Sequence, residues 1–257
     1  MRIIEGRNPV LEALKSDTGI DTILISKEAA QGSLNKITEL AKEKNILVKN
    51  VDKATLDRLS ENKRHQGVIA EAIEYEYKDI DDILDYAKSK GEKPFVIILD
   101  EITDVHNLGA IIRTAECLGA HGIIIPKRRA AQVNGVVAKS SAGAIEYLPV
   151  ARVTNISQTI EELKEKGLWI YGADMDGKNV YDEKFDTPVG LVIGSEGTGI
   201  GRLVKEKCDN LVKIPMKGKI NSLNASCAAS IIIYEVMKQR CIWYAKNKKR
   251  ISLYWWL

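Results

Sequence analysis

The chain has 257 residues, of which 45% are hydrophobic and 28% are charged, an ordinary composition for a soluble globular protein of one or two domains. The formal net charge of +3 permits a nucleic-acid partner but is too small to demand one. No apolar run approaches the roughly 20 residues of a membrane-spanning helix, and the charged N-terminus lacks the apolar core of a signal peptide.

Residues 1–77 alternate helical and strand patterns, which predicts a small α/β unit with a core of its own. Strands are expected at 22–26, 46–51 and 68–77, and helices at 9–15, 33–44 and 52–61. The loop before the last strand is locally basic and carries Lys63, Arg64 and His65. A solvated loop is one interpretation of this cluster, and contact with phosphates is the other.

The segment 78–94 is strongly charged and ends in a run of Ser, Lys, Gly, Glu and Pro. That composition predicts a linker between two domains, although an amphipathic pattern occurs within it.

From Phe95 onward, strands and helices alternate, which predicts a second α/β domain over 95–241 with a mainly parallel sheet. Residues 95–100 form a continuous apolar run, typical of a parallel strand covered on both faces. A helix is expected to begin at Asn107 and to end before Gly119. Further strands are expected at 122–126, 147–153, 168–173, 188–194 and 211–216, and helices at 130–141, 155–167, 200–208 and after Asn224.

The remaining segment, 242–257, is a basic aromatic tail that holds three of the four tryptophans. Nucleic-acid bases can stack on such aromatics, but a poorly ordered terminus explains the composition equally well, and no role is assigned to it.

Cysteine usage indicates a reducing compartment. The cysteines lie far apart, without zinc-type spacing, and three fall in predicted helices among apolar neighbours; they are Cys117, Cys208, Cys227 and Cys241. Buried, reduced thiols in a cytoplasmic protein are therefore expected, and no metal site is predicted.

The most specific local pattern lies between residues 211 and 237. A short apolar strand ends at Pro215, a loop contains Gly218, and Ser222 and Asn224 stand where an apolar helix begins. The loop backbone and the unpaired N–H groups of the first helical turn can face a ligand. The alternative is that the two polar residues only cap the helix.

Two nucleotide-binding patterns are approached but not met. Residues 172–179 nearly match a P-loop, but Asn179 stands where a magnesium-binding hydroxyl is needed, and two aspartates inside the segment would repel phosphates. Residues 194–201 are rich in glycine without the G-x-G-x-x-G spacing, and Glu196 would sit badly beside a pyrophosphate. An uncharged or cationic ligand fits this second loop better.

Three strand–loop–helix junctions carry polar loops: 100–115, 191–197 and 214–224. Together they closely resemble the three motifs of the SpoU-type RNA ribose 2′-O-methyltransferases of the SPOUT class, over residues 95 to about 240. The smaller domain resembles the ribosomal-protein-like RNA-binding domain of the large-subunit rRNA guanosine 2′-O-methyltransferases.

The resemblance implies an α/β fold with a trefoil-knotted parallel-sheet methyltransferase domain, S-adenosylmethionine held in the knot, a homodimer, and an RNA substrate containing a guanosine of 23S rRNA. The cofactor is expected to lie against Gly194, Ile214, Met216 and Leu223. The family's catalytic or near-catalytic positions fall on Arg113, Asn107, Glu196, Ser222 and Asn224. RNA is expected to contact Lys63, Arg64 and His65.

Methyl transfer from a sulfonium donor requires no metal, but the acceptor hydroxyl must lose its proton as the methyl group arrives. Arg113 stays protonated at ordinary pH, so we expect it to grip a phosphate and to stabilise the developing alkoxide. Asn107, as a helix cap, would fix this geometry, and Glu196 would orient Arg113 or the ribose.

Other functions remain open at this point. One is a ribose methyltransferase that acts on tRNA, and another is a catalytically silent RNA-binding module of the same fold. A nucleotide-dependent enzyme of a different class is disfavoured by the failed P-loop and dinucleotide patterns.

Overall fold

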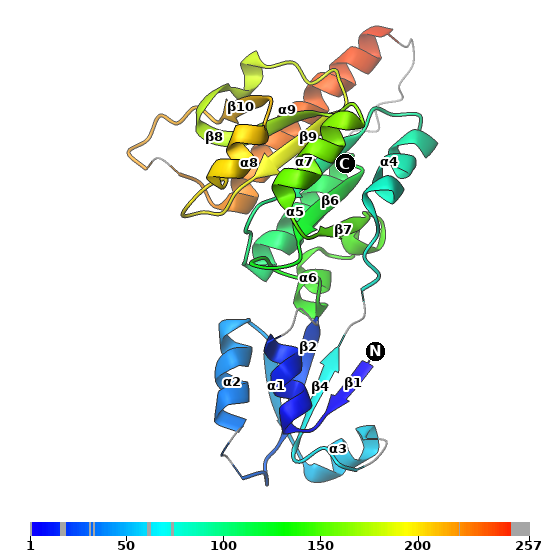
Figure 1. Ribbon diagram of the computed structural model, residues 1–257, viewed down its shortest axis with the longest axis vertical. Helices are drawn as coiled ribbons and strands as arrows, with labels where there is room; N and C mark the ends of the chain where they lie inside the picture. The colour runs from blue at the N-terminus through cyan, green and yellow to red at the C-terminus, as the bar shows by residue number, and fades with distance from the viewer. Residues whose placement is uncertain are drawn as a thin grey trace, which may run out of the picture.

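The computed structural model describes residues 2–15, 19–30, 32, 34–60, 63–72, 75–220 and 222–247, and only the backbone of Arg2 and of 242–247. Two α/β units follow one another along the long axis of the molecule (Figure 1). The smaller unit is N-terminal, and the larger contains a parallel sheet, so the predicted fold class is confirmed. The knot implied by the resemblance stays a prediction.

The N-terminal unit is a four-stranded sheet in the order β1-β4-β2-β3, with helices on both faces. Its elements are β1 (Arg2–Glu5), α1 (Arg7–Lys15), β2 (Ile20–Ser26), α2 (Leu34–Glu43), β3 (Leu47–Val51), α3 (Lys53–Leu59) and β4 (Val68–Ala72). Strands β2 and β3 run parallel, whereas β4 pairs antiparallel with β1 and β2. Val10 of α1 and Ile37 of α2 are fully buried in one core cluster, and Leu56 of α3 is buried in a second cluster.

The C-terminal unit is built on a six-stranded sheet in the order β10-β8-β9-β5-β6-β7, in which every pair is parallel. Its elements are α4 (Ile80–Ser89), β5 (Phe95–Leu99), α5 (Val105–Cys117), β6 (Gly122–Pro126), α6 (Gly135–Ser140), the 3-10 turn η1 (Ala144–Glu146), β7 (Val150–Val153), α7 (Ile156–Glu165), β8 (Trp169–Asn179), the 3-10 turn η2 (Val180–Asp182), β9 (Val189–Ile193), α8 (Arg202–Lys207), β10 (Asn210–Lys213) and α9 (Ala225–Asn247).

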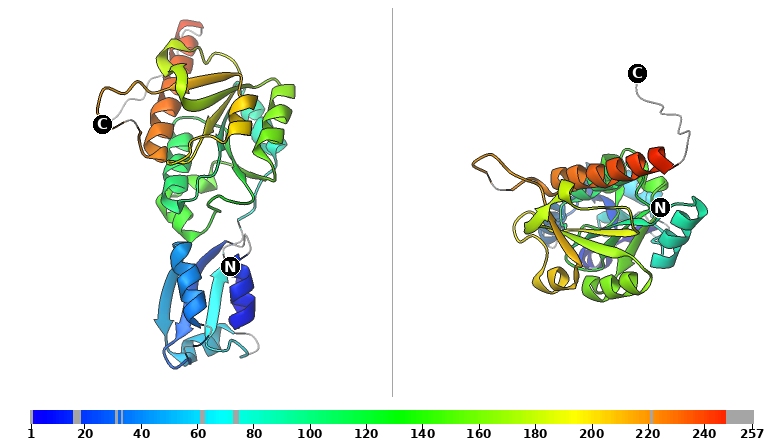
Figure 2. Two further views of the ribbon diagram at one scale, coloured as in Figure 1. Left: turned by 60° about the vertical axis from the view of Figure 1, so that its left-hand side comes forward. Right: turned by 90° about the horizontal axis from the view of Figure 1, so that it is seen from above.

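Helices cover both faces of this sheet (Figure 2). Helices α5, α6 and α9 contribute buried side chains to one core cluster, and α4, α7 and α8 contribute to the other. The central strands β5, β6 and β9 are buried at every position, which explains why their sequences are continuous apolar runs.

The prediction of a linker over 78–94 is wrong for most of that segment. Helix α4 occupies its middle, begins with a capping box at Asp79, and buries Ile83 and Ala87 completely. Ile83 belongs to the same core cluster as strands β5 and β6. Because only these two positions of the helix are fully buried, charged residues dominate the composition of the segment. Its sequence therefore resembles a linker rather than a helix that packs on a core.

Two further expectations are corrected. The tail does not begin at 242, because α9 continues to Asn247; residues 248–257 lie outside the described residues. The cysteines are free but not buried. Cys117, Cys227 and Cys241 are exposed, and Cys208 is intermediate. Cys117, for example, is the last residue of α5 and lies beyond the last buried position of that helix, Ala115.

Candidate active site

Three junctions converge at one edge of the parallel sheet. The carboxyl ends of β5, β9 and β10 lead into α5, into the loop 194–201 and into the loop 214–224, and the carboxyl ends of parallel strands meet at the same edge. The two loops border a cavity of about 530 Å³. It is lined by all four residues predicted for the cofactor, Gly194, Ile214, Met216 and Leu223, and by Glu196 and Ser222.

The loop 194–201 folds tightly back on itself. Ser195 and Gly199 exchange backbone hydrogen bonds of 3.1 and 3.0 Å. A Cβ atom on Gly194 would lie 2.1 Å from the carbonyl carbon of Gly199. The loop can therefore close only because residue 194 has no side chain.

The cavity has apolar walls and a polar rim. Ile193, Val212 and Ile232 line its inner part, and Met216 and Leu223 are partly exposed at its mouth. Residues of the two loops and of the carboxyl-terminal part of β8 supply most of the remaining surface. A ligand with a flat apolar portion and polar edges matches such a slot.

A polar cluster joins all three junctions beside this cavity. The side chains of Asn107 and Asn224 both donate to Oε1 of Glu196, the first at 2.9 Å. Asn224 also donates to Oδ1 of Asn107 at 3.0 Å, and the backbone N–H of Ala225 donates to Glu196 Oε1 at 3.2 Å. The carboxylate is thus held in place by donors from two different helices.

The helix caps explain how these side chains are placed. The prediction that Asn107 caps α5 is wrong. Asp104 caps the helix and accepts from the backbone N–H groups of His106 and Asn107 at 2.8 Å. Asn107 therefore lies inside the first turn, where its side chain is free to reach Glu196.

Asn224, in contrast, does cap α9. Its Oδ1 atom accepts from the backbone N–H groups of Ser226 at 3.0 Å and Cys227 at 3.3 Å, while its Nδ2 atom points to Asn107 and Glu196. The two interpretations of this residue, cap and site residue, are therefore both compatible with its geometry.

Arg113 is not part of this cluster. It is exposed on α5, six residues after Asn107, which places it roughly 240° further around the helix axis. Among the described residues, no hydrogen bond or ion pair joins Arg113 to Glu196. Of the two roles expected for Glu196, orientation of Arg113 therefore has no contact to carry it within one chain, and orientation of the ribose stays a prediction.

The basic loop of the N-terminal unit exposes two of its three predicted RNA contacts. Lys63 and Arg64 are exposed. His65 is only 4% exposed, lies 3.1 Å from a carboxylate oxygen of Asp57, and accepts from the backbone N–H of Gly67 through Nδ1. His65 therefore stabilises the conformation of the loop. Because its side chain is buried, the prediction that it contacts RNA is corrected.

Sequence analysis missed a charged group at the cavity. Lys205 lies 2.9 Å from Asp174 and 2.8 Å from Asp176, and all three line the cavity. The hydrogen bond from Lys205 lowers the pKa of Asp176, and the two carboxylates raise the pKa of Lys205. Both aspartates lie on strand β8, so this segment is not a P-loop, as the sequence predicts. Their position close to the carboxyl edge of the sheet could have marked them as candidates for the site.

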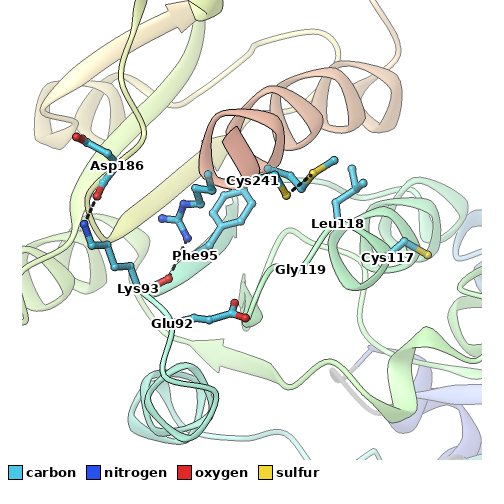
Figure 3. Close-up of a pocket in the computed structure, with 10 residues that line it drawn as sticks. Glu92, Lys93, Phe95, Cys117, Leu118, Gly119, Asp186 and Cys241 are labelled. Atoms are coloured by element: carbon cyan, nitrogen blue, oxygen red, sulfur yellow. Dashed lines mark hydrogen bonds between the residues drawn. The ribbon is translucent and has the colours of Figure 1, made fainter. Parts of the chain in front are cut away.

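A second cavity, of about 440 Å³, lies at the opposite edge of the sheet (Figure 3). It is bordered by the start of β5 at Phe95 and by the end of α5 at Leu118 and Gly119. Arg240 lines it too, but donates to four backbone carbonyls, including those of Lys93 and Thr187. None of the predicted site residues borders this cavity.

Within the described residues, no group of three or more His, Cys, Asp or Glu side chains could hold a metal ion. No helix in that part of the chain is long and apolar enough to cross a membrane.

Two family models match the chain. Residues 94–234 match the SpoU rRNA Methylase family, and residues 3–78 match the model described as RNA 2′-O ribose methyltransferase substrate binding. Among curated proteins, a putative TrmH family tRNA/rRNA methyltransferase, YacO of Bacillus subtilis, is 49% identical over 236 residues, covering 91% of this chain and 94% of the relative. A Staphylococcus haemolyticus protein with the same family description is 48% identical over 239 residues, covering 93% and 96%.

Solved structures agree with this result. The SpoU methyltransferase AviRb from Streptomyces viridochromogenes, in complex with the cofactor AdoMet, is 29% identical, with a TM-score of 0.59 over 93% of this chain and 90% of that chain. An rRNA methyltransferase from Sinorhizobium meliloti is 23% identical, with a TM-score of 0.57 over 92% and 86%, and supports the fold alone.

Proposed function

We propose that this chain, which belongs to the SpoU rRNA methylase family, methylates a ribose 2′-hydroxyl of RNA, and that the acceptor is a guanosine of 23S rRNA. The chain is an RNA methyltransferase that uses S-adenosylmethionine. The ribose oxygen as acceptor is supported by the description of the family that matches residues 3–78. The guanosine and the ribosomal RNA are supported by the sequence resemblance to the large-subunit enzymes.

The cavity at the carboxyl edge fits the cofactor. Its volume of about 530 Å³ lies within the range of small-molecule sites, and its apolar walls suit an adenosyl group. Gly194, Ile214, Met216 and Leu223 would hold it, and Gly194 keeps the loop closed behind it. When bound there, the cofactor supplies a methyl group already activated by a positively charged sulfur.

The cluster of Asn107, Glu196 and Asn224 carries the proposal. All three hydrogen bonds to the carboxylate end on Oε1, and Oε2 accepts none from the described residues. We assign Oε2 the role of accepting a hydrogen bond from the substrate ribose, which orients the sugar. The two asparagines hold the carboxylate in one position, so little reorganisation is needed when RNA binds.

Arg113 would supply the positive charge that the developing alkoxide needs, but it lies away from the cluster of its own chain. Beside it, Thr114 and Ser230 join α5 to α9 by a hydrogen bond of 3.1 Å. On α9, Ile231 is 43% exposed and Tyr234 is 49% exposed, an apolar surface that suits a partner. We propose that the chain forms a homodimer through this face and that Arg113 serves the site of the partner subunit.

One experiment tests the reaction. The purified protein is incubated with tritium-labelled S-adenosylmethionine and with total RNA from cells that lack the gene. A methyl group on the 2′-oxygen makes the adjacent linkage resistant to alkali, because alkaline cleavage needs that hydroxyl. Label in alkali-resistant dinucleotides of 23S rRNA, and 2′-O-methylguanosine in the nucleoside mass spectrum, are the expected results.

The same experiment separates the alternatives. Label confined to tRNA would assign the chain to tRNA instead, a possibility that the names of its relatives include. A methyl group on a base would reject the ribose as acceptor. Retention of RNA without any label would indicate a silent binding module.

A further inference from the structure

A loop next to the candidate active site carries three consecutive basic residues that the function described so far does not use. Lys127, Arg128 and Arg129 follow directly after β6, at the same edge of the sheet as the polar cluster, and all three are exposed. The side chain of Arg129 is 84% exposed, and its ion-pair partner is Glu101, at 3.6 Å. Lys127 and Arg128 form no ion pair with a described residue.

The loop is attached to the segment that begins α5. The backbone N–H of Ala131 donates to the carbonyl of Ile102 at 2.7 Å. Ile102 precedes the helix cap Asp104 by two residues, and that cap positions Asn107. The basic loop therefore lies beside the cluster that we assign to the ribose.

The backbone of the loop is held in a fixed shape. Arg129 has φ of 58° and Glu101 has φ of 57°, a left-handed conformation that residues other than glycine adopt rarely. Lys127 donates its N–H to the carbonyl of Val153 at 2.7 Å, and the side chain of Gln132 donates to the carbonyls of Pro126 and Ala130 at 3.1 and 3.2 Å. The backbone that carries the basic side chains is thus already ordered, so binding need not order it.

The basic loop of the N-terminal unit cannot perform this local role. Lys63 and Arg64 precede β4, and β4 runs from the far tip of the small unit towards the C-terminal unit (Figure 1). The loop before β4 therefore lies at the tip of the small unit that points away from the C-terminal unit, which holds the cluster. An RNA held only there would leave its target nucleotide unrestrained at the active site.

We propose that Lys127, Arg128 and Arg129 form a second RNA-backbone contact, which grips the phosphates that flank the target nucleotide. This inference rests on the proposed methylation of RNA at this site. Lys127 and Arg128 carry most of the contact, because Arg129 is partly neutralised by Glu101. Phosphate contacts fix the position of the nucleic acid without reading its sequence.

The test uses the full-length protein, with the variant Lys127→Gln/Arg128→Gln compared with wild type. Arg129 is left intact, because its side chain pairs with Glu101 and its backbone is strained. The control, Lys88→Gln/Lys184→Gln, removes the same charge from exposed positions of the C-terminal unit that lie away from the cluster. Binding of 23S rRNA that lacks the modification is measured by filter binding at salt concentrations from low to above physiological, and binding of S-adenosylhomocysteine by calorimetry.

The expected result is a rise of about tenfold or more in the Kd for RNA, and a slope of log K against log salt that is shallower by about 1.5, since each lost phosphate contact removes roughly 0.7–0.9. Affinity for S-adenosylhomocysteine should not change, and the control should bind RNA like wild type. An unchanged Kd and slope, or an equal loss in the control, would overturn the inference. RNA binding is measured without methyl transfer, so the Kd and the salt slope remain informative even if the proposed reaction is wrong. A failure of the proposed reaction would appear separately, in the labelling experiment.

Discussion

Asn107 and Asn224 stand 117 residues apart in the sequence, yet Nδ2 of Asn224 donates to Oδ1 of Asn107 at 3.0 Å. Both asparagines also donate to the same oxygen of Glu196. Their second roles differ, because Asn224 caps α9, whereas the cap of α5 is Asp104 rather than Asn107. Because of this difference, replacing each asparagine in turn can separate the contribution of the cluster to catalysis from its contribution to protein stability.

Asn107→Ala should therefore slow methyl transfer, by about 10²-fold through loss of positioning, and change the free energy of unfolding little. Asn224→Ala should slow the reaction to a similar degree and also lower the free energy of unfolding by about 1 kcal/mol, because α9 loses its cap. Urea unfolding and initial rates of label transfer measure the two effects.

Asn224→Ser provides the matched control. A serine can cap the helix but cannot bridge Asn107 and Glu196, so stability should return while activity should not. Equal destabilisation by the Asn107 and Asn224 replacements would contradict this division of roles.

The cofactor loop depends on the absence of a side chain at one position. Gly194→Ala would place a Cβ atom 2.1 Å from the carbonyl carbon of Gly199, a backbone atom that cannot move without opening the loop. We expect affinity for S-adenosylhomocysteine to fall at least tenfold, as calorimetry would show. Gly197→Ala is the control in the same loop, because no atom lies within 4 Å of the position that its Cβ would take, and binding should stay within a few-fold of wild type. Equal affinities for the two variants would disprove the packing argument.

Much of this site could be predicted from the sequence, because strand ends and glycine-rich loops are local signals. The apolar runs of β5 and β9 predicted the sheet edge. Gly194, Ile214 and Leu223, which the resemblance to the family assigned to the cofactor, line one cavity there. The helix cap was misplaced because Asp104 and Asn107 are both capping residue types, three residues apart, and only the backbone decides between them.

Other features could not be predicted because they depend on partners distant in the sequence. The burial of His65 depends on its packing beside Asp57 of the preceding helix. The direction of Arg113 depends on which face of α5 packs against α9, and a motif comparison does not contain that information.

Lowering the pH should reduce the stability of the protein through His121, which lies at the amino-terminal edge of the parallel sheet. Burial lowers the pKa of this imidazole below its ordinary value of 6.5, and the carboxylate of Glu92, 3.2 Å away, opposes this shift only in part. Nδ1 of His121 accepts the buried N–H of Phe95 at 3.0 Å, which requires that nitrogen to be unprotonated. The unfolded chain therefore binds the proton more readily, so the contribution of His121 to stability is complete above about pH 6.5 and is lost as the pH falls through the lower folded-state value.

Melting temperatures between about pH 7.5 and pH 5 measure this effect across the range in which histidine titrates. His121→Gln should be less stable than wild type at the upper end of this range but should lose less stability on acidification. His106→Gln removes an exposed histidine and should keep the wild-type profile. Parallel profiles for wild type and His121→Gln would show that this group does not set the acid sensitivity.

Arg113 offers the sharpest test of the proposed dimer. Arg113→Ala should lower the rate of methyl transfer by about 10²–10³-fold, as expected for loss of a group that stabilises a developing oxyanion. Binding of S-adenosylhomocysteine should remain, because Arg113 does not border the cofactor cavity. Arg113→Lys keeps the charge but not the planar fork of donors, and should recover only part of the rate.

If Arg113 serves the site of the partner subunit, two inactive variants should restore activity when they are combined. A heterodimer of Arg113→Ala and Glu196→Gln has one site with both residues intact and one site with neither. Random pairing makes half of the dimers heterodimers, so the co-expressed mixture should show about a quarter of the wild-type rate. Recovery of this size, absent from each variant alone, requires that the two residues act across a dimer. No recovery in a mixture that sediments as a dimer would mean that Arg113 acts within its own chain, reaching the alkoxide through the bound RNA, and the proposed exchange between subunits would be wrong.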